Sequence, residues 1–419
     1  MNKIERLAYN LIKKNAPLKN LIVYLYQIPF LIKSFFRKKI ITDLKFKKID
    51  GFFGFHDRPS INTLGDVLIH RELEEFIDGI GTAELGFINI HDKNSSFNII
   101  TKTSTCNYQQ GSLATWLTDD LIILNNYVNN EKQCQIFDKK RNLICSYPFH
   151  FFSASKCGRY ISSLSFARFG QGLKGYGYSI NYPHDEYEDS KFKIPNTNFG
   201  DLFVFDLHEK KVVLQFKISD LLTKSTNLLN DGYFYFSHSN FSLNSNFIYF
   251  LLRSSNNKLN TSQLIIANLH TNKVLIAPTQ GMVSHLDWLS DNKIIAYCNC
   301  LGYQTDGYYT FEIKENNIIA NQVTLENLNS DGHPSAISDC QFITDTYPDR
   351  SRFQHLIYVN LKNNSTKELA KIYSPLRFRG VQRTDLHPRV SRCKNFLTID
   401  SSFQGKRTQL IMNIHEIIE

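Results

Sequence analysis

The spacing of apolar residues divides the chain into two unequal parts. Near the N-terminus, apolar residues recur at the interval of a helix, with basic residues between them: Ile4, Leu7, Ala8, Leu11 and Ile12. From residue 51 onward, this spacing gives way to short runs of Val, Ile, Tyr and Phe that are separated by polar turns. The pattern predicts a basic amphipathic helical segment over residues 1–50 and a β-rich domain over residues 51–419.

The β-rich part repeats one unit. Each unit reads as two hairpins, and seven such units of roughly 40–55 residues follow one another. Four strands at this period are typical of a β-propeller blade. Because one unit cannot bury both faces of its sheet, the units must close into a ring. We therefore predict an all-β, seven-bladed β-propeller, with a six-bladed ring as the alternative. Its final strand, Gln409–Asn413, should complete the last blade or pair with residues near Gly51.

The charge of the chain is concentrated at one end. Residues 1–50 contain 12 Lys and Arg against 3 Asp and Glu, so they carry the whole net charge of +9, and the remaining residues are balanced. A balanced propeller argues against nucleic-acid binding. The eight cysteines form no CxxC pair, which argues against a zinc ribbon and favours free thiols in a reducing, cytoplasmic compartment.

The N-terminal segment has the features of a membrane-surface helix. Its apolar run, residues 21–32, is about a dozen residues long, contains Pro29 and falls short of the roughly 20 residues that a spanning helix needs. Lysines and an arginine follow it. We expect residues 1–40 to lie on an anionic membrane, at the inner face, without crossing it. A helix that caps the propeller, or a signal anchor, would explain the same pattern.

The longest unit carries an insertion that begins near Phe166. It contains four glycines within residues 170–177, but these match no phosphate-binding fingerprint. Loops of this length are functional or disordered. The insertion is therefore either a loose surface loop or a lid over the mouth of the channel that supplies Arg168 and Tyr178.

Four histidines share one position in successive units. Each stands three residues before the apolar residue that precedes the first turn: His238, His285, His333 and His387. Because the first strand of each blade lines the channel, we expect the four imidazoles to converge there. Converging neutral imidazoles are typical ligands of Zn, Fe or Mn. The alternative is a polar channel lining that is hydrogen-bonded to water.

Further polar residues are expected near these histidines. Three carboxylates stand close in sequence and could orient the imidazoles: Asp287, Asp331 and Asp385. Three more side chains should point toward the same mouth: His56, Gln110 and Arg389.

Motifs around the histidines resemble those of known propellers. The motifs are Gly281–His285, Asp331–His333, Thr344–Asp349 and Asp385–Arg389. They resemble uncharacterised bacterial β-propellers encoded with surface-polysaccharide genes and, more distantly, oligogalacturonate lyases, in which channel histidines hold a metal. The resemblance implies that His238 is a base and that His285 and His333 are metal ligands. His387, one blade further on, completes the metal set that we predict.

These observations support two functions of different classes. The first is a metal-assisted enzyme that cleaves a uronic-acid-containing carbohydrate by β-elimination. His238 would be the base, the metal with Arg168 or Arg389 would neutralise the carboxylate, and Tyr178 or water would protonate the leaving oxygen. The second is a non-catalytic scaffold at the inner membrane face that holds polysaccharide-assembly proteins. A role beside a glycosyltransferase is a third option, but no sugar-nucleotide motif supports it.

Overall fold

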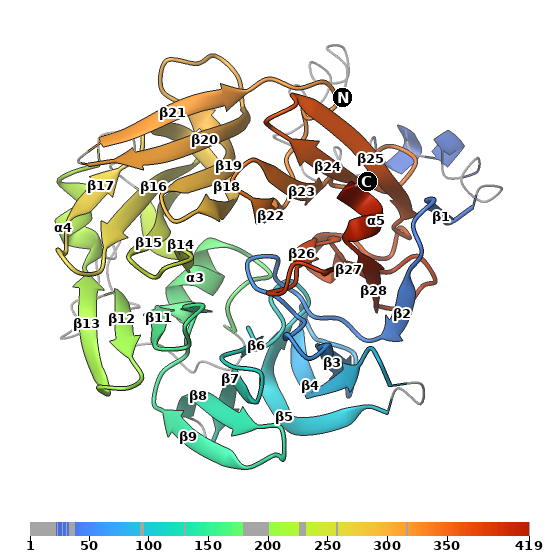
Figure 1. Ribbon diagram of the computed structural model, residues 1–419, viewed down its shortest axis with the longest axis horizontal. Coiled ribbons are helices and arrows are strands. Elements are labelled where there is room, and N and C mark those ends of the chain that lie inside the picture. The colour runs from blue at the N-terminus through green and yellow to red at the C-terminus, as the bar shows by residue number, and fades with distance from the viewer. Residues whose placement is uncertain are drawn as a thin grey trace.

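The computed structural model is a ring of seven β-sheets that surround a common centre (Figure 1). The structure describes residues 22–418 apart from 23, 27, 31, 33–37, 93–95, 130, 179–200, 226–231, 257–258 and 316. We number the sheets as blades 1–7 in chain order. The prediction of a seven-bladed β-propeller is confirmed.

All blades follow one antiparallel plan, in which consecutive strands pair from the centre outward. Blade 1 contains β3 (Asp66–Glu72), β4 (Ile80–Asn89) and β5 (Asn98–Asn107). Blade 2 contains β6 (Thr115–Trp116), β7 (Leu121–Val128), β8 (Glu131–Asp138) and β9 (Leu143–Tyr147). Blade 3 contains β10 (Ser153–Ala154), β11 (Tyr160–Leu164), β12 (Leu202–Asp206) and β13 (Lys211–Phe216).

The next two blades have long inner strands. Blade 4 contains β14 (Tyr233–Phe241), β15 (Phe247–Ser255), β16 (Asn260–Asn268) and β17 (Val274–Ile276). Blade 5 contains β18 (Thr279–Ser290), β19 (Lys293–Cys300), β20 (Gly307–Lys314) and β21 (Asn317–Val323).

The last two blades have short inner strands. Blade 6 contains β22 (Ser335–Ser338), β23 (Gln341–Asp345), β24 (Phe353–Asn360) and β25 (Ser365–Tyr373). Blade 7 contains β26 (Arg389–Val390), β27 (Phe396–Ser401) and β28 (Thr408–Asn413).

The ring is closed by the N-terminal part of the chain. Strand β2 (Lys47–Asp50) pairs antiparallel with β28 and is the outermost strand of blade 7, so the predicted pairing of the last strand near Gly51 is confirmed. Strand β1 (Ile40–Ile41) pairs with β25 and gives blade 6 a fifth strand. The boundary that we predicted at residue 50 therefore lies too late, because β1 and β2 belong to the sheets of the propeller.

Blade 1 departs from the four-strand plan at the centre. Its innermost position is taken by residues 52–61, which pair with β3 through two isolated bridges, Phe52–His70 and Ile61–Val67. We call residues 53–59 the central segment. It is anchored to blade 7, because the amides of Phe53 and Gly54 donate to Asp400 at 3.1 and 2.8 Å.

The central segment also reaches the neighbouring blades. The guanidinium of Arg58 donates to the carbonyls of Leu113 and Phe152 at 2.8 and 2.7 Å. Gly54 has φ 107°, and a Cβ there would lie 2.5 Å from the amide nitrogen of Gly111, so only glycine fits this close approach. The segment therefore follows one path, fixed from several blades.

The described part of the insertion in blade 3 is packed rather than loose. Helix α3 (Phe166–Gly172) and the residues up to Tyr178 bury four aromatic rings: Phe166, Phe169, Tyr176 and Tyr178. The acidic residues that follow lie outside the described part. The alternative of a loose surface loop therefore does not hold for residues 166–178.

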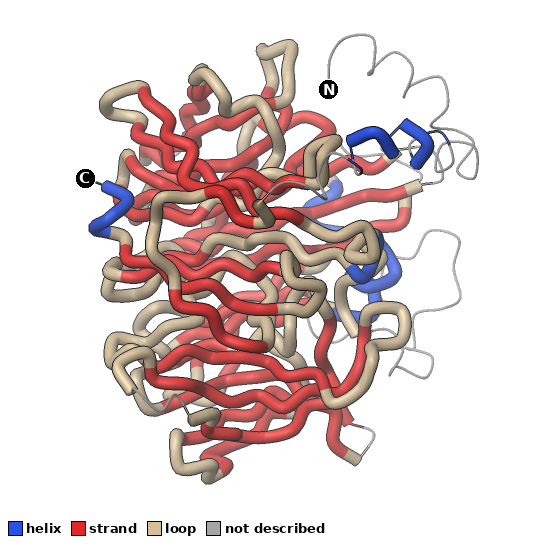
Figure 2. The backbone as a smooth tube through the Cα atoms, turned by 90° about the vertical axis from the view of Figure 1, so that its right-hand side faces the viewer, coloured by secondary structure: helices blue, strands red, loops and turns tan. Residues whose placement is uncertain are grey.

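Helices contribute little to the described structure. Besides α3, they are α4 (Ile218–Leu222), a 3-10 turn (Gly380–Gln382), α5 (His415–Ile418) and helical residues between Ile22 and Ile32 (Figure 2). Across the described residues, none of the helices is both long and apolar enough to cross a membrane. All eight cysteines are free thiols.

Candidate functional site: a cluster of imidazoles

Five buried imidazoles meet where the inner strands converge. Ring centroids of neighbours from consecutive blades are 6.0 Å apart for His238 and His285, 3.9 Å for His285 and His333, and 4.3 Å for His333 and His387. His56 of the central segment lies against three of them, at 5.4, 5.1 and 5.9 Å from His285, His333 and His387. Each of the five is at most 5% exposed.

Irregular backbone, rather than strand alternation, turns these side chains inward. His238 and His387 have φ of 53° and 46°, a left-handed conformation that residues other than glycine adopt rarely. His238 and His285 lie where the pairing of β14–β15 and β18–β19 shifts register. His333 and His387 precede β22 and β26. Backbone strain of this kind clusters at functional sites, because the surrounding fold must hold it in place.

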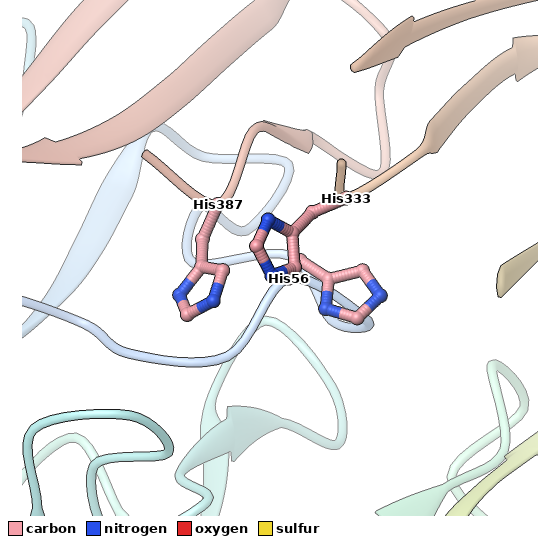
Figure 3. A group of neighbouring side chains, drawn as sticks. All are labelled: His56, His333 and His387. Carbon is pink, nitrogen blue, oxygen red and sulfur yellow. The ribbon is translucent and has the colours of Figure 1, made fainter. Parts of the chain in front are cut away.

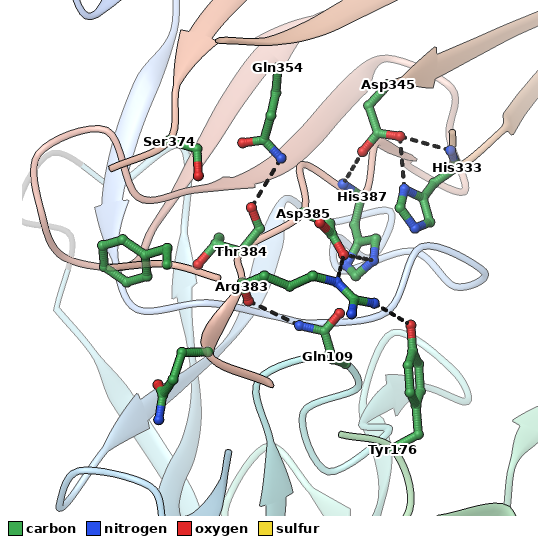
Figure 4. Close-up of polar contacts among 12 residues, drawn as sticks. Gln109, Tyr176, His333, Asp345, Gln354, Ser374, Arg383, Thr384, Asp385 and His387 are labelled. Atoms are coloured by element: carbon green, nitrogen blue, oxygen red, sulfur yellow. Dashed lines mark hydrogen bonds and ion pairs between the residues drawn. The ribbon is translucent and has the colours of Figure 1, made fainter. Parts of the chain in front are cut away.

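Two of the histidines are oriented by hydrogen bonds at Nδ1. The Nδ1 of His333 donates to Asp345 at 2.8 Å (Figure 4). The Nδ1 of His387 donates to the carbonyl of Gly54 at 2.5 Å. A carbonyl oxygen only accepts, so Nδ1 of His387 carries the proton. The buried Nε2 atoms of both rings then present lone pairs and have no hydrogen-bond partner.

Asp345 fixes both of these ligand-bearing loops. One of its oxygens also accepts the backbone amide of His333 at 2.7 Å, and the other accepts that of His387 at 3.0 Å. A side chain at Gly332 would clash, because its Cβ would lie 1.8 Å from the carbonyl oxygen of Asp345. Burial raises the pKa of Asp345 to about 7, although the two backbone amides that donate to its carboxylate act to lower that pKa.

Burial keeps four of the imidazoles neutral. Loss of solvent is the largest cause that lowers the pKa of His56, His238, His333 and His387 well below the usual value, and the neighbouring imidazoles lower it further. A neutral imidazole offers a lone pair, which is the form that binds a cation or accepts a proton.

Three of these rings can reach a common point (Figure 3). One nitrogen each of His56, His333 and His387 lies within 4.8 Å of the others, and both ring nitrogens of His56 are buried without a partner. The orphaned nitrogens fit a metal ion that takes three imidazole ligands. The metal set that we predicted was His285, His333 and His387; among the described residues, the three nitrogens that lie this close together belong to His56, His333 and His387.

His285 is held beside this group by a different contact. Its Nδ1 lies 3.0 Å from the hydroxyl of Ser284 and 3.4 Å from Asp331, to which Ser284 also donates at 2.7 Å. Asp331 therefore stands in the orienting position that we expected for it.

The two other expected carboxylates do less for the imidazoles. Asp385 lies 3.9 Å from the Nε2 of His387 and pairs with Arg383 at 2.6 Å. Burial alone would raise the pKa of Asp385, but Arg383 lowers it to about 2. Asp287 accepts two backbone amides and orients none of the described histidines.

Charged and phenolic side chains stand between the imidazoles and solvent. Arg383 donates to the hydroxyl of Tyr176 at 2.9 Å, and its guanidinium lies 6.0 Å from the ring of Tyr347, which is 5.9 Å from the ring of His333. Tyr347 is 36% exposed, so its side chain reaches from the cluster to the surface.

Arg253 is a second cation near the cluster. Its guanidinium donates to the hydroxyls of Ser237 and Ser262 at 2.7 and 3.0 Å, and no carboxylate of the described residues pairs with it. Ser237 precedes His238, and the charge of Arg253 helps to lower the pKa of His238 after burial. Burial lowers the pKa of Arg253, and nearby acidic groups such as Asp331 raise it in part.

The structure does not bring Arg168 and Tyr178 to the imidazoles. Arg168 is buried and donates to the carbonyl of Phe234, whereas Tyr178 donates to the carbonyl of Gly111 and stacks on Phe166. Their contacts hold the insertion in place.

Two further residues predicted near the mouth also have structural contacts. Gln110 accepts from the amide of Gly177, and Arg389 pairs with Asp400 at 2.9 Å and donates to Gly54. Both secure the segments around the cluster.

Sequence reasoning missed the roles of Asp345, Arg253 and Arg383. Asp345 stands in one of the motifs that carried the resemblance, but nothing in the spacing linked it to two histidine loops. Arg253 lies on β15 behind the inner strand, where the pattern gave no signal. His56 was expected near the mouth, but not as a ligand.

A small cavity adjoins the cluster at the central segment. It has a volume of about 110 Å³, and its lining includes His56, Asp57, Asn240, Asp287 and Ser335. His56 therefore lies between this cavity and the other imidazoles.

Comparison with known proteins adds information on the fold. No known family model matches the chain, and no curated protein matches it in sequence. Among solved structures, an oligogalacturonate lyase from Vibrio parahaemolyticus is similar, with a TM-score of 0.56, 12% identity, and coverage of 91% of this chain and 99% of that one. At this identity the similarity shows the fold alone.

Two other solved structures match with lower scores. An acylaminoacyl peptidase from Pyrococcus horikoshii matches with a TM-score of 0.47 and 11% identity over 83% of this chain and 49% of that one. TolB from Acinetobacter baumannii matches with a TM-score of 0.39 and 12% identity over 83% and 80%. A fold does not by itself determine a function, so the function must be argued from the site.

Proposed function

We propose that the protein is a metal-binding β-propeller that cleaves a uronic-acid-containing glycan by β-elimination. The observation that carries this proposal is the convergence of His56, His333 and His387 with buried, unpartnered nitrogens. Nitrogen ligands of this kind suit zinc, iron or manganese. The fold that the chain shares with an oligogalacturonate lyase is compatible with this chemistry.

The residues around the cluster divide the work of an elimination. A cation held by the three imidazoles would neutralise negative charge on the substrate carboxylate. His238 has two unpartnered ring nitrogens and would accept the proton that lies α to that carboxylate. Arg253 would bind the carboxylate beside His238. Because Tyr178 is committed to the carbonyl of Gly111, water would protonate the leaving oxygen.

The metal-binding part is tested by elemental analysis of purified protein. Wild type should carry one divalent metal, and the double variant His333→Ala with His387→Ala should lose it. The control is His270→Ala, an exposed histidine that contacts Asn246, which should keep the metal. Equal metal content in wild type and double variant would remove the basis of the proposal.

The catalytic part is tested on uronate oligosaccharides. Elimination creates an unsaturated uronate, whose ultraviolet absorbance reports the rate. Arg253→Ala should lower kcat/KM by about a hundredfold to a thousandfold, the range for losing one group that stabilises developing charge, while the metal content stays unchanged. The matched control is Arg377→Ala, which removes an exposed arginine. A protein that holds metal but never forms the unsaturated product would contradict the lyase activity alone.

A second candidate function is a scaffold at a membrane. It is favoured by the net charge of the first 50 residues and by the exposed apolar side chains of the helical residues Ile22, Tyr24 and Leu25. A scaffold needs no metal and no free imidazoles. Wild-type protein that contains no metal and turns over no uronate, yet binds lipid, would favour this alternative.

A further inference from the structure

The loops at the imidazole end of the ring carry exposed apolar side chains. In each blade the second strand runs antiparallel to the inner strand and ends where the inner strand begins. The pairs Thr279–Cys300 and Tyr233–Ser255 show this for blades 5 and 4. The loop that follows the second strand therefore lies at the end of the ring where the inner strands begin, which we call the imidazole end. Six large side chains on four such loops are 36–75% exposed: Leu73, Ile77, Leu259, Leu301, Tyr303 and Tyr347. We call these six residues the rim.

The opposite end of the ring also exposes apolar side chains. Leu64 lies there in a turn between first and second strands, Leu143 and Ile144 follow the turn between β8 and β9, and Ile418 belongs to α5; these four are 41–54% exposed. Apolar exposure alone therefore does not choose between the two ends, and the position of the N-terminal helix decides.

The N-terminal helical residues lie on the same side as the rim. Arg350, in the loop that contains Tyr347, donates to the hydroxyl of Tyr26 and lies 5.4 Å from the ring of Phe30. Figure 2 shows these helical residues on one side of the ring and α5 on the other. The helix exposes further apolar side chains, with Leu25 at 55% and Ile32 at 56%.

Charge identifies what would cover this surface. The N-terminal 50 residues carry the entire net charge of +9, and Lys38 and Lys39 follow the apolar helical stretch. Apolar side chains that enter the acyl boundary, with lysines at the headgroups, are the features of binding to an anionic bilayer. A protein partner would have no need for charge confined to one flanking segment.

We propose that the rim and the N-terminal helix dock the propeller on an anionic lipid bilayer, so that the imidazole cluster opens toward the membrane. This inference does not depend on metal binding or catalysis. If the proposed function is correct, the glycan is taken from the membrane surface.

The first experiment measures co-sedimentation with vesicles of phosphatidylglycerol and phosphatidylcholine. Full-length protein should bind at low salt and be released as salt screens the basic residues. The double variant Ile77→Glu with Leu301→Glu should bind at least about tenfold more weakly, because two apolar side chains no longer enter the bilayer. The matched control Leu64→Glu, at the opposite end, should bind like wild type.

The second experiment reports the orientation. Both native tryptophans, Trp116 and Trp288, are at most 2% exposed, so a tryptophan introduced at the surface can be followed. Brominated lipids should quench Ile77→Trp and leave Leu64→Trp unchanged.

Several results would overturn the inference. They are absence of binding to vesicles at low salt, equal loss of binding in the Leu64→Glu control, or equal quenching at both tryptophan sites. Rim substitutions that change the oligomeric state without lipid would show a contact between copies instead. Metal content and uronate turnover, measured in solution, should be the same in the rim variants, so failure here is distinct from failure of the proposed function.

Discussion

Replacing Asp345 with asparagine isolates what orients the imidazole cluster. In wild type, one oxygen of Asp345 accepts the amide and Nδ1 of His333, and the other accepts the amide of His387. The amide group of asparagine keeps one acceptor oxygen and places an NH₂ group in the second position. The amide of His387 then faces a donor instead of an acceptor.

The size of the effect follows from these contacts. One buried donor loses its partner, which costs about 1–3 kcal/mol of unfolding free energy. The bonds to His333 remain, but their acceptor can no longer be charged, and loss of such an orienting carboxylate lowers metal affinity about 10–100-fold. We therefore expect Asp345→Asn to be moderately less stable and to bind metal much more weakly.

Two assays separate these effects. Urea denaturation gives the unfolding free energy, and titration of the metal against a chelator gives the affinity. The control is Asp339→Asn, an exposed carboxylate in the same blade, which should match wild type in both. Wild-type metal affinity in Asp345→Asn, whatever its stability, would refute the reasoning that Asp345 orients the ligands.

Two further predictions concern stability. Asp400→Ala leaves Arg389 buried without its partner and should cost about 3–5 kcal/mol in urea denaturation, whereas Asp50→Ala, which removes an exposed pair with Lys406, should cost at most about 1 kcal/mol. Similar losses in both would contradict the role given to the buried pair. Burial raises the pKa of Asp201 to about 6 in the folded protein, so this group stabilises the fold below pH 4 and loses that contribution as the pH rises toward 6. The unfolding free energy of Asp201→Asn should therefore rise by about 1–3 kcal/mol relative to that of wild type as the pH increases from 4 to 7. A difference that stays the same at every pH would contradict the raised pKa of Asp201.

The sequence by itself determined the repeat, the ring and its closure. Alternation of apolar residues is a local property of a strand, so the hairpins of each blade could be read directly from the chain. Because a single blade cannot bury both faces of its sheet, the blades then had to close into a ring. The pairing of Gln409–Asn413 near Gly51 followed from the same requirement, and β2 pairs with β28 as expected.

The sequence also located four of the five imidazoles, through their common position before the first turn. It could not give the path of the central segment, which brings His56 to the cluster by contacts with residues more than 300 positions away, such as Asp400. It likewise could not give the left-handed backbone at His238 and His387, because a periodic pattern carries no information on such exceptions.

Only the tertiary structure decided which groups are free to act. Arg168 looked suited to neutralise charge, but the fold places it on the carbonyl of Phe234. The guanidinium of Arg253 instead donates to two hydroxyls and pairs with no carboxylate of the described residues. Asp345 links two blades, and its partners are 12 and 42 residues away in the chain. Periodicity records which way a side chain points from its own strand. The partners that it meets depend on how the ring closes and how the central segment fills it.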